Sequence, residues 1–192
     1  MKQDMNNFYE ALKYEDSQMS PANKFYESLG FTNIRRCRYE TPTGRKNQEA
    51  DIDLKAKYNG KIIKISEKFR SIDYGDVMVE LEDKFEGSMN KNGWIFKSKA
   101  DYIFYHTPKA LYIIPVVYLR KLAEYVYDTQ WDNFKDKILK LSSWRTGPSS
   151  DPNYPDVRFK HISTTSMGRK LWEGLQVIIP LRYIDNIKII HK

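Results

Sequence analysis

The stretch that decides the fold is ADIDLKAKYNGKIIKISEKFR, residues 50–70. Apolar and charged residues alternate on both sides of an Asn-Gly pair, and this arrangement is the strongest short-range signal for a β-hairpin. We therefore predict two antiparallel strands, Ala50–Lys57 and Lys61–Arg70, joined at Tyr58-Asn59-Gly60.

Side chains alternate between the two faces of a strand, and this alternation sorts the polar residues of the hairpin. On the first predicted strand Asp51 and Asp53 share a face. On the second, Ser66 and Lys68 share a face, whereas Glu67 points to the apolar side. If the two polar faces coincide, carboxylates and an ammonium group point the same way. Hard oxygen ligands suit Mg²⁺, and a neighbouring lysine stabilises negative charge during phosphodiester hydrolysis.

The composition favours a polyanionic partner. The 192 residues include 32 Lys+Arg against 25 Asp+Glu, a net charge of +7, and basic proteins attract nucleic acids. The length and the 41% share of hydrophobic residues fit one globular domain over residues 1–192. A single cysteine, Cys37, permits neither an internal disulfide nor a Cys-based zinc site.

Several classes of protein are disfavoured by what the sequence lacks. The first residues contain no apolar segment typical of a signal peptide, and no apolar run approaches the ~20 residues of a membrane span. The dispersed glycines form no phosphate-binding loop, so we expect no nucleoside triphosphate as substrate. We expect a cytoplasmic protein with no membrane partner.

Helical and strand patterns alternate along the rest of the chain. Before the hairpin we predict a helix over Asn6–Lys13, a helix that starts at Ser20-Pro21 and stops at Gly30, a strand over Ile34–Tyr39 and a loop over Glu40–Lys46. After it we predict a strand over Asp76–Glu82, a loop over Glu86–Gly93 and β-rich runs at Trp94–Phe96, Asp101–His106 and Ala110–Pro115. Further along we predict helices over Val116–Asp128 and Trp131–Leu141 and a loop over Gly147–Pro155. The chain then continues with a predicted helix near Gly168–Gly174 and a strand over Leu175–Pro180. This order predicts an α/β or α+β fold around one sheet.

The hairpin and its surroundings resemble the PD-(D/E)XK nuclease superfamily, in particular its phage and bacterial members. The resemblance rests on QEADIDL at Gln48–Leu54, ISEKFR at Ile65–Arg70 and GWIFKSKADY at Gly93–Tyr102, and it covers residues 20–120. It implies a restriction-endonuclease-like fold, an αβββαβ core with a mixed central sheet flanked by helices, to which residues 121–192 add helical and C-terminal elements. It also implies a DNA endonuclease that uses Mg²⁺ or Mn²⁺, in a bacterial or phage-infected cell.

The family pattern assigns roles to residues of the hairpin. Its metal-binding aspartate on the second core strand corresponds to Asp53, with Asp51 as the competing choice. Its lysine on the third strand corresponds to Lys68. The family also has an acidic residue two positions before the lysine, where this chain has Ser66, and Glu67 is the neighbouring acid.

Three explanations of Ser66 stay open. A β-bulge re-aims Glu67 toward the metal, or the second carboxylate comes from elsewhere, for instance from Glu80 on the next strand. Alternatively the metal site is incomplete, and the protein is a weak or inactive DNA-binding protein that retains the nuclease fold. A helical acid such as Glu27 is a further candidate ligand.

Basic residues around the hairpin are candidate contacts to DNA phosphates. They are Arg35, Arg36, Arg38 and Arg70, although the first three equally fit solvated charge on a strand. Cutting both strands of a duplex commonly takes two active sites, which makes a homodimer plausible. A third interpretation is a protein-interaction module that contacts a partner through its aromatic C-terminal third.

Overall fold

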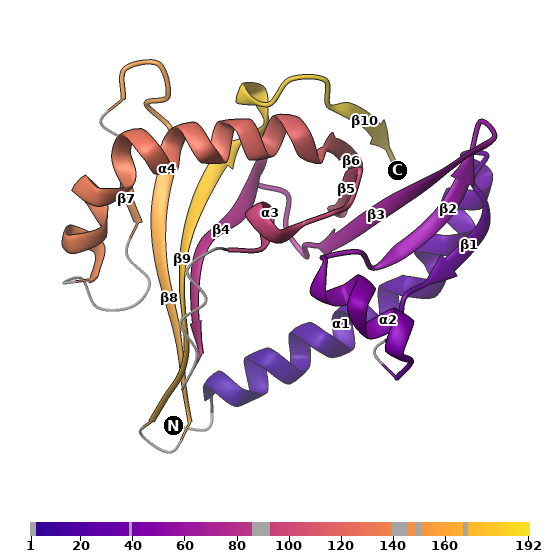
Figure 1. Ribbon diagram of the computed structural model, residues 1–192, viewed down its shortest axis with the longest axis horizontal. Helices are drawn as coiled ribbons and strands as arrows, with labels where there is room; N and C mark the ends of the chain where they lie inside the picture. Colours follow the sequence, from indigo (N-terminus) through magenta and orange to yellow (C-terminus); the bar gives the residue numbers. More distant parts are fainter. Residues whose placement is uncertain (1–2, 39, 86–92, 140–145, 149–150, 167–168) are drawn as a thin grey trace. The chain divides into compact units, whose positions relative to one another are not determined.

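The computed structural model describes residues 3–38, 40–85, 93–139, 146–148, 151–166 and 169–192. The chain is a mixed α/β protein with a six-stranded sheet, a four-stranded sheet and several helices (Figure 1). It divides into two compact units. The first unit comprises Met1–Ile72, Ser98–Ile113 and Ile189–Lys192, and the second comprises Asp73–Lys97 and Ile114–Lys188. The range 20–120, expected to form a nuclease-like core, includes parts of both.

The six-stranded sheet lies mainly in the first unit and has the strand order β1-β2-β3-β5-β6-β10. The elements associated with it are α1 (Gln3–Ser28), β1 (Thr32–Arg36), α2 (Pro42–Glu49), β2 (Leu54–Tyr58), β3 (Lys61–Phe69), β5 (Tyr102–His106), β6 (Ala110–Pro115) and β10 (Lys188–His191). The first three strands pair antiparallel, and β3 pairs parallel with β5. The sheet is therefore mixed.

The four-stranded sheet lies in the second unit and has the strand order β4-β9-β8-β7. The elements of this unit are β4 (Asp76–Phe85), α3 (Trp94–Lys97), α4 (Val116–Leu139), β7 (Thr146–Pro148), β8 (Arg158–Ser166), β9 (Arg169–Pro180) and the 3-10 helix η1 (Leu181–Tyr183). Figure 1 shows β4, β9 and β8 as long neighbouring strands, and both pairs are antiparallel. The strand predicted over Asp76–Glu82 is present, but it belongs to this sheet and not to the sheet of the hairpin.

The predicted hairpin is present as β2 and β3. Tyr58 pairs with Lys61 across the turn, and both turn residues have positive φ, 48° at Asn59 and 81° at Gly60. Positive φ at both central positions defines the type I′ turn, whose twist matches that of the flanking strands. The Asn-Gly pair thus sets the register of the hairpin, although its first strand begins at Leu54 and not at Ala50.

We expect Gly60→Ala to lower the free energy of unfolding by about 1 kcal/mol. An added Cβ at Gly60 would meet no atom of a described residue within 4 Å, so we attribute the cost to the left-handed backbone. Urea denaturation of the variant measures it. Gly30→Ala serves as a comparison, because Gly30 also has positive φ, at 90°, and an unchanged midpoint in both variants would contradict the prediction.

Helix α1 covers one face of the six-stranded sheet. Tyr26 is fully buried in a cluster with Leu54, Ile65 and Phe104, and its ring meets the Phe104 ring edge-on at 5.1 Å between centroids. Each fully buried side chain of this size contributes about 1.5–3 kcal/mol through removal from water. The packing fixes the side of the sheet on which α1 lies.

The predicted helix boundary at Ser20-Pro21 is wrong, because α1 runs without interruption through Pro21. Proline inside a helix removes one hydrogen bond. Ala22 and Tyr26, one turn apart, are both buried, and we attribute the continuity to this tertiary packing, which stabilises most protein helices. The predicted stop at Gly30 is confirmed: Phe31 N donates to the Tyr26 carbonyl at 3.0 Å, as in a Schellman ending.

The loop predicted over Glu40–Lys46 is also wrong, since most of it forms α2. The Thr41 side chain caps this helix by accepting from Gly44 N at 3.0 Å, and Pro42 occupies the first turn. A Cβ at Gly44 would lie 1.8 Å from the carbonyl oxygen of Arg38, two residues beyond the end of β1. The backbone at Arg38 therefore approaches α2 so closely that only glycine fits at position 44. The strand predicted over Ile34–Tyr39 is correspondingly shorter, and Tyr39 lies outside the described residues.

Further predictions fail in the second unit. The two helices predicted between residues 116 and 141 form the single helix α4, Trp94–Phe96 is helical in α3, and the helix predicted near Gly168–Gly174 is replaced by strand β9. Pairing with β8 supplies hydrogen-bond partners that a local pattern does not reveal. The loop predicted over Gly147–Pro155 overlaps β7 at its start, and residues 86–92 of the loop predicted over Glu86–Gly93 lie outside the described residues.

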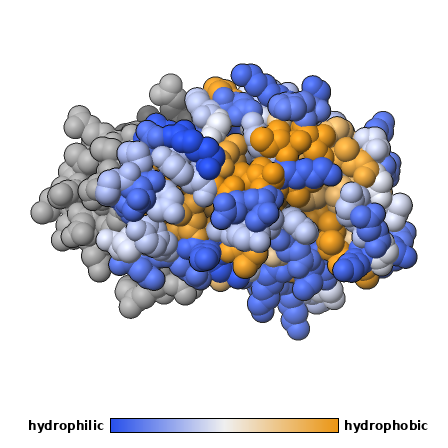
Figure 2. All heavy atoms as spheres, turned by 90° about the horizontal axis from the view of Figure 1, so that it is seen from above, coloured by the Kyte–Doolittle hydropathy of each residue, from blue (hydrophilic) through white to orange (hydrophobic). Residues whose placement is uncertain are grey.

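Exposed apolar residues are scattered over the described surface. Figure 2 shows hydrophobic residues interspersed with hydrophilic ones on one face. The large exposed ones are Ile62, Ile72, Tyr74, Val117, Tyr118, Tyr125 and Ile189. Such scatter is normal for a folded protein. Over the described part of the chain, no helix combines the length and hydropathy needed to cross a bilayer.

Candidate functional site

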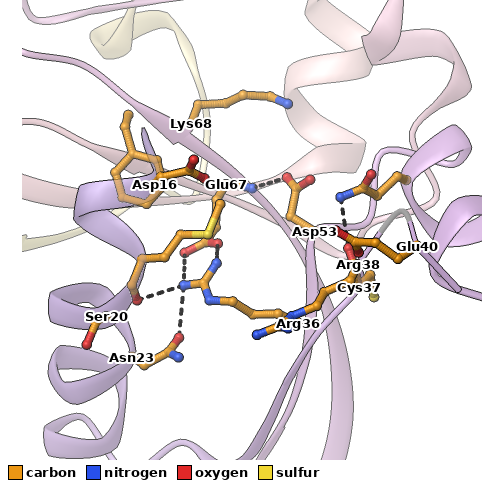
Figure 3. A pocket seen from close by; sticks show the side chains of 13 residues that line it. Asp16, Ser20, Asn23, Arg36, Cys37, Arg38, Glu40, Asp53, Glu67 and Lys68 are labelled. Carbon is orange, nitrogen blue, oxygen red and sulfur yellow. Dashed lines mark hydrogen bonds and ion pairs between the residues drawn. The ribbon is translucent and has the colours of Figure 1, made fainter. Parts of the chain in front are cut away.

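An open cavity of about 670 Å³ in the first unit brings the predicted hairpin residues together. Asp53, Glu67 and Lys68 all line it, and Figure 3 shows them above Arg36 and Asn23. Glu67 and Lys68 lie on β3, and Asp53 directly precedes β2, one residue outside the strand on which it was predicted, whereas β1 and α1 supply Arg36 and Asn23. The cavity therefore combines carboxylate, ammonium and guanidinium groups from four segments of the chain.

The aspartate of the family pattern, Asp53, is held by the main chain of β3. Its N–H donates to the Ile65 carbonyl at 2.9 Å, and its Oδ2 accepts from Glu67 N at 2.7 Å. Burial raises the pKa of Asp53, and the nearby Lys68 ammonium opposes that rise. The Glu67 N–H thus fixes the carboxylate, and the hydrogen bond to Ile65 fixes the backbone of Asp53.

Asp51 does not lie on the strand, contrary to prediction. Helix α2 ends at Glu49, and Asp51 follows in the left-handed region with φ 53°. The period-two argument therefore does not apply to it. Even so, its Oδ1 accepts from the Lys68 ammonium at 2.8 Å, while its buried Oδ2 has no hydrogen-bond partner among the residues that the structure describes. The charge of Asp51 also contributes to the raised pKa of Asp53.

Glu67 points to the face of the sheet that carries α1, as the alternation predicted. The Tyr26 hydroxyl donates to its Oε1 at 2.5 Å, and the Arg36 guanidinium forms an ion pair with its carboxylate. The pairing of β3 with β5 runs without a shift from Ile65 to Phe69, so the β-bulge explanation is wrong. Burial raises the pKa of Glu67, against the hydrogen bond and charge of Arg36.

Arg36 is itself held by several acceptors. Besides Glu67, it donates to Asn23 Oδ1 at 2.9 Å and to the Met19 carbonyl at 3.0 Å. The side chain of Glu67 is only 3% exposed and that of Arg36 16%. This is a largely desolvated ion pair, so each partner depends strongly on the other.

The network extends from Tyr26 to His106, which sequence reasoning missed. The Tyr26 oxygen lies 2.5 Å from His106 Nε2, and the His106 ring stacks on Phe69 with centroids 4.6 Å apart. Because the single Tyr26 hydroxyl hydrogen goes to Glu67, Nε2 must carry the hydrogen of the neutral imidazole. Burial, followed by the charges of Lys192 and Arg36, lowers the pKa of His106 to about 3. No local pattern marks either residue.

Acid should destabilise the fold through His106. The unfolded chain binds a proton at this residue below pH 6.5, whereas the folded chain does so only near its lowered pKa of about 3. Stability therefore falls as the pH decreases through this window. Each pKa unit corresponds to about 1.4 kcal/mol, so we expect a loss of about 2 kcal/mol between pH 7.5 and pH 5.

Urea unfolding of the wild type and of His106→Gln at both pH values measures this loss. The variant should lack it, because glutamine can donate to Tyr26 without titrating. The raised pKa of Glu67 acts in the opposite direction, since a raised carboxyl pKa costs stability as the pH rises, and it is common to both proteins. Equal pH dependence in the two would contradict the role of His106.

The remaining predicted residues are distributed around the molecule. Glu80 lies on β4, the next strand along the chain as predicted, but β4 belongs to the four-stranded sheet, and the strand that pairs with β3 is β5. Arg35 and Arg38 are exposed, and so is Glu27 on α1. Arg70 directly follows the end of β3, and its guanidinium carbon lies 5.7 Å from the centre of the Tyr105 ring.

Of the carboxylates predicted on the hairpin, Asp51 and Asp53 remain for a metal, and Asp16 and Glu40 are further acidic residues in the lining of the cavity. Among the described residues, no group of three or more His, Cys, Asp or Glu side chains is arranged to hold a metal ion. Magnesium typically uses one or two carboxylates and completes its shell with water and phosphate. Within the described ranges the buried Oδ2 of Asp51 has no hydrogen-bond partner, so the carboxylates of Asp51 and Asp53 fit such a site. Glu67 does not fit as a ligand, because Arg36 and Tyr26 already occupy its carboxylate.

Comparisons of this chain with protein-family models, with curated proteins and with solved structures found no match. The geometry of the cavity is what bears on function. It presents a fixed aspartate, a lysine held by a second aspartate, and a buried arginine–glutamate pair. These groups suit the binding of a phosphate together with a cation.

Proposed function

We propose that this protein is a metal-dependent DNA endonuclease that hydrolyses phosphodiester bonds with Mg²⁺ or Mn²⁺. One observation carries the proposal: Asp53 and Lys68, from the two arms of one hairpin, line a single open cavity. A carboxylate for a metal and an ammonium for a phosphate are the two elements that metal-assisted phosphodiester hydrolysis needs.

The order of elements in the first unit supports a restriction-endonuclease-like fold. Helix α1 precedes three consecutive antiparallel strands, and β5 then pairs parallel with the third of them. The αβββαβ core expected from the resemblance also begins with a helix and three strands, although α2 here lies between β1 and β2. The connection from β3 to β5 passes through β4 and α3 of the second unit.

Each residue has a distinct role in the proposed reaction. Asp53 and Asp51 would hold the metal, which when bound activates water and offsets charge on the phosphate. Lys68 would donate to a phosphate oxygen and stabilise the developing negative charge. Asp51 keeps the Lys68 ammonium in place before substrate binds, through the 2.8 Å ion pair. Glu67 would keep Arg36 in the cavity wall and not bind metal.

A second candidate function is DNA binding without cleavage. It is favoured because Arg36 and Tyr26 already bind the Glu67 carboxylate. Of the predicted metal ligands on the hairpin, Asp51 and Asp53 then remain, whereas the family pattern has a further acidic residue on the third strand. This candidate predicts DNA binding that is sensitive to salt and insensitive to EDTA. It also predicts no cleavage product with any divalent ion.

Incubation of the purified protein with plasmid, single-stranded and branched DNA distinguishes the two functions. Parallel reactions contain Mg²⁺, Mn²⁺ or EDTA, and gel electrophoresis detects nicked or shortened products. We expect products with Mg²⁺ or Mn²⁺ only. Persistent binding with no product on any of these substrates would favour the inactive DNA-binding protein. Sedimentation of the same sample tests the expected homodimer.

A further inference from the structure

Three basic residues stand side by side across the first three strands of the six-stranded sheet. Arg35 on β1 is directly opposite Lys55 on β2, and Lys55 is directly opposite Lys64 on β3. Directly opposite residues of antiparallel strands point to the same face, with Cβ atoms about 4.5–5.5 Å apart. We refer to Arg35, Lys55 and Lys64 as the cationic row.

The cationic row lies on the face of the sheet away from α1. Leu54, Ala56 and Ile65, the neighbours of Lys55 and Lys64 along their strands, are buried in the cluster beneath α1, so the lysines between them point the other way. Arg35 and Lys64 are exposed, and Lys55 is half-buried. The row is therefore open to a partner in solvent.

An irregularity in β1 creates this alignment. The register shifts between Thr32, which pairs with Lys57, and Arg35, which pairs with Lys55. Three steps along β1 thus match two along β2, and Asn33 adopts a positive φ of 50° within this segment. A single-residue shift moves every following side chain to the opposite face. Without the extra residue, Arg35 would point toward α1 and Arg36 away from Glu67.

Folding alone does not account for the cationic row. Like charges directly opposite one another on a sheet are destabilising. In the part of the chain that the structure describes, none of the three side chains takes part in an ion pair. The Asp101 carboxylate lies beside β3, but it accepts from the backbone N–H of Lys64 at 2.7 Å. A costly arrangement of this kind is expected where function requires it.

The cationic row is adjacent to the candidate site on the same strands. Asp53 precedes Lys55 by two residues, and Ser66 follows Lys64 by two, with Lys68 two further on. Two residues span about 6.6–6.8 Å along a strand. A phosphate chain that crosses the row would thus pass close to Asp53 and Lys68.

We propose that the cationic row binds the phosphate backbone of DNA and directs it to the cavity of Asp53 and Lys68. This inference rests on the proposed function. Adjacent strands are about 4.8 Å apart, so the row spans about 10 Å. Duplex DNA carries one negative charge per ~1.7 Å of its axis, so several phosphates face the three cations over that length.

The test compares two triple variants that lose the same charge. In the row variant Arg35, Lys55 and Lys64 are changed to alanine. In the control variant three exposed lysines away from the row are changed to alanine: Lys24 on α1, Lys109 between β5 and β6, and Lys188 at the start of β10. Fluorescence anisotropy with a labelled DNA duplex, in EDTA and at several salt concentrations, gives the affinity and its salt dependence.

For the row variant we expect the slope of log affinity against log salt to become shallower by about 2.7, because each phosphate contact contributes about 0.9. We also expect at least about a tenfold loss of affinity at low salt, whereas the control variant should resemble the wild type. Thermal unfolding of the row variant should occur at the same or a higher temperature, since like-charge repulsion is removed.

Several results would overturn the inference. One is a salt slope for the row variant equal to that of the wild type or of the control variant. Another is a lower unfolding temperature, which would assign the row a structural role. A loss of heparin binding with unchanged DNA binding would indicate another polyanion. The test does not depend on cleavage. If the wild type never cleaves DNA but the row variant loses DNA binding, the nuclease proposal is rejected and the role of the cationic row is retained. If the row variant cleaves DNA as fast as the wild type, the role of the cationic row is rejected and the nuclease proposal is retained.

Discussion

Replacing Asp53 with asparagine, or Lys68 with methionine, will lower Mg²⁺-dependent DNA cleavage by about a hundred- to a thousandfold. The first change removes the charge that would hold the metal, and the second removes the donor to the phosphate. The asparagine oxygen can still accept from Glu67 N, as Asp53 Oδ2 does at 2.7 Å. We therefore expect both variants to fold normally.

Initial rates of plasmid nicking in Mg²⁺ measure this effect, and circular dichroism verifies the fold. Asp101→Asn is a matched control for Asp53, because the Asp101 carboxylate also accepts a backbone N–H of β3, at 2.7 Å, without lining the cavity. Lys109→Met is the control for Lys68 at an exposed position. Cleavage that survives both Asp53→Asn and Lys68→Met would refute the assignment of the site.

Replacing Arg36 with methionine will lower the free energy of unfolding at pH 7 by about 3–5 kcal/mol. The Glu67 side chain is 3% exposed, and Arg36 is its charged partner. Without the guanidinium, the buried carboxylate must either remain charged in an apolar setting or take up a proton. Arg36 also donates to the Met19 carbonyl and to Asn23, so its loss additionally weakens the contact between β1 and α1.

Urea denaturation at pH 7 gives the stability of each variant. Arg35→Met is the matched control, because this adjacent arginine is exposed on the opposite face and should change stability by no more than about 0.5 kcal/mol. Adding Glu67→Gln to Arg36→Met should recover a large part of the loss, since the unpaired charge disappears. If Arg36→Met costs no more than Arg35→Met, the ion pair has no structural importance.

Local signals predicted the hairpin well. Asn59 and Gly60 both adopt positive φ, and this preference belongs to the residues themselves. The stop of α1 at Gly30 is likewise local. Where tertiary contacts compete with local preference, the predictions failed: Pro21 was predicted to start a helix, yet it lies inside α1, where Ala22 and Tyr26 pack against the sheet.

The candidate site was predicted only in part, and the failures have a common cause. Asp53 and Lys68 lie in one cavity, as alternation along two paired strands suggests. The position of Asp51 depends on where α2 ends, and its pairing with Lys68 depends on a left-handed turn. Glu80 is on the next strand along the chain, as predicted, but that strand, β4, pairs with β9 in the other sheet.

By itself, the sequence determined the turn, the alternation of faces and the basic charge, because each depends on residues close together in the chain. Only the tertiary structure decided the partners of Glu67. Arg36, Tyr26 and His106 come from β1, α1 and β5, respectively, and they meet through the packing of α1 on the sheet and through the register of three strands. Contacts of this kind depend on which elements pack together, so no short segment of the chain contains a signal for them.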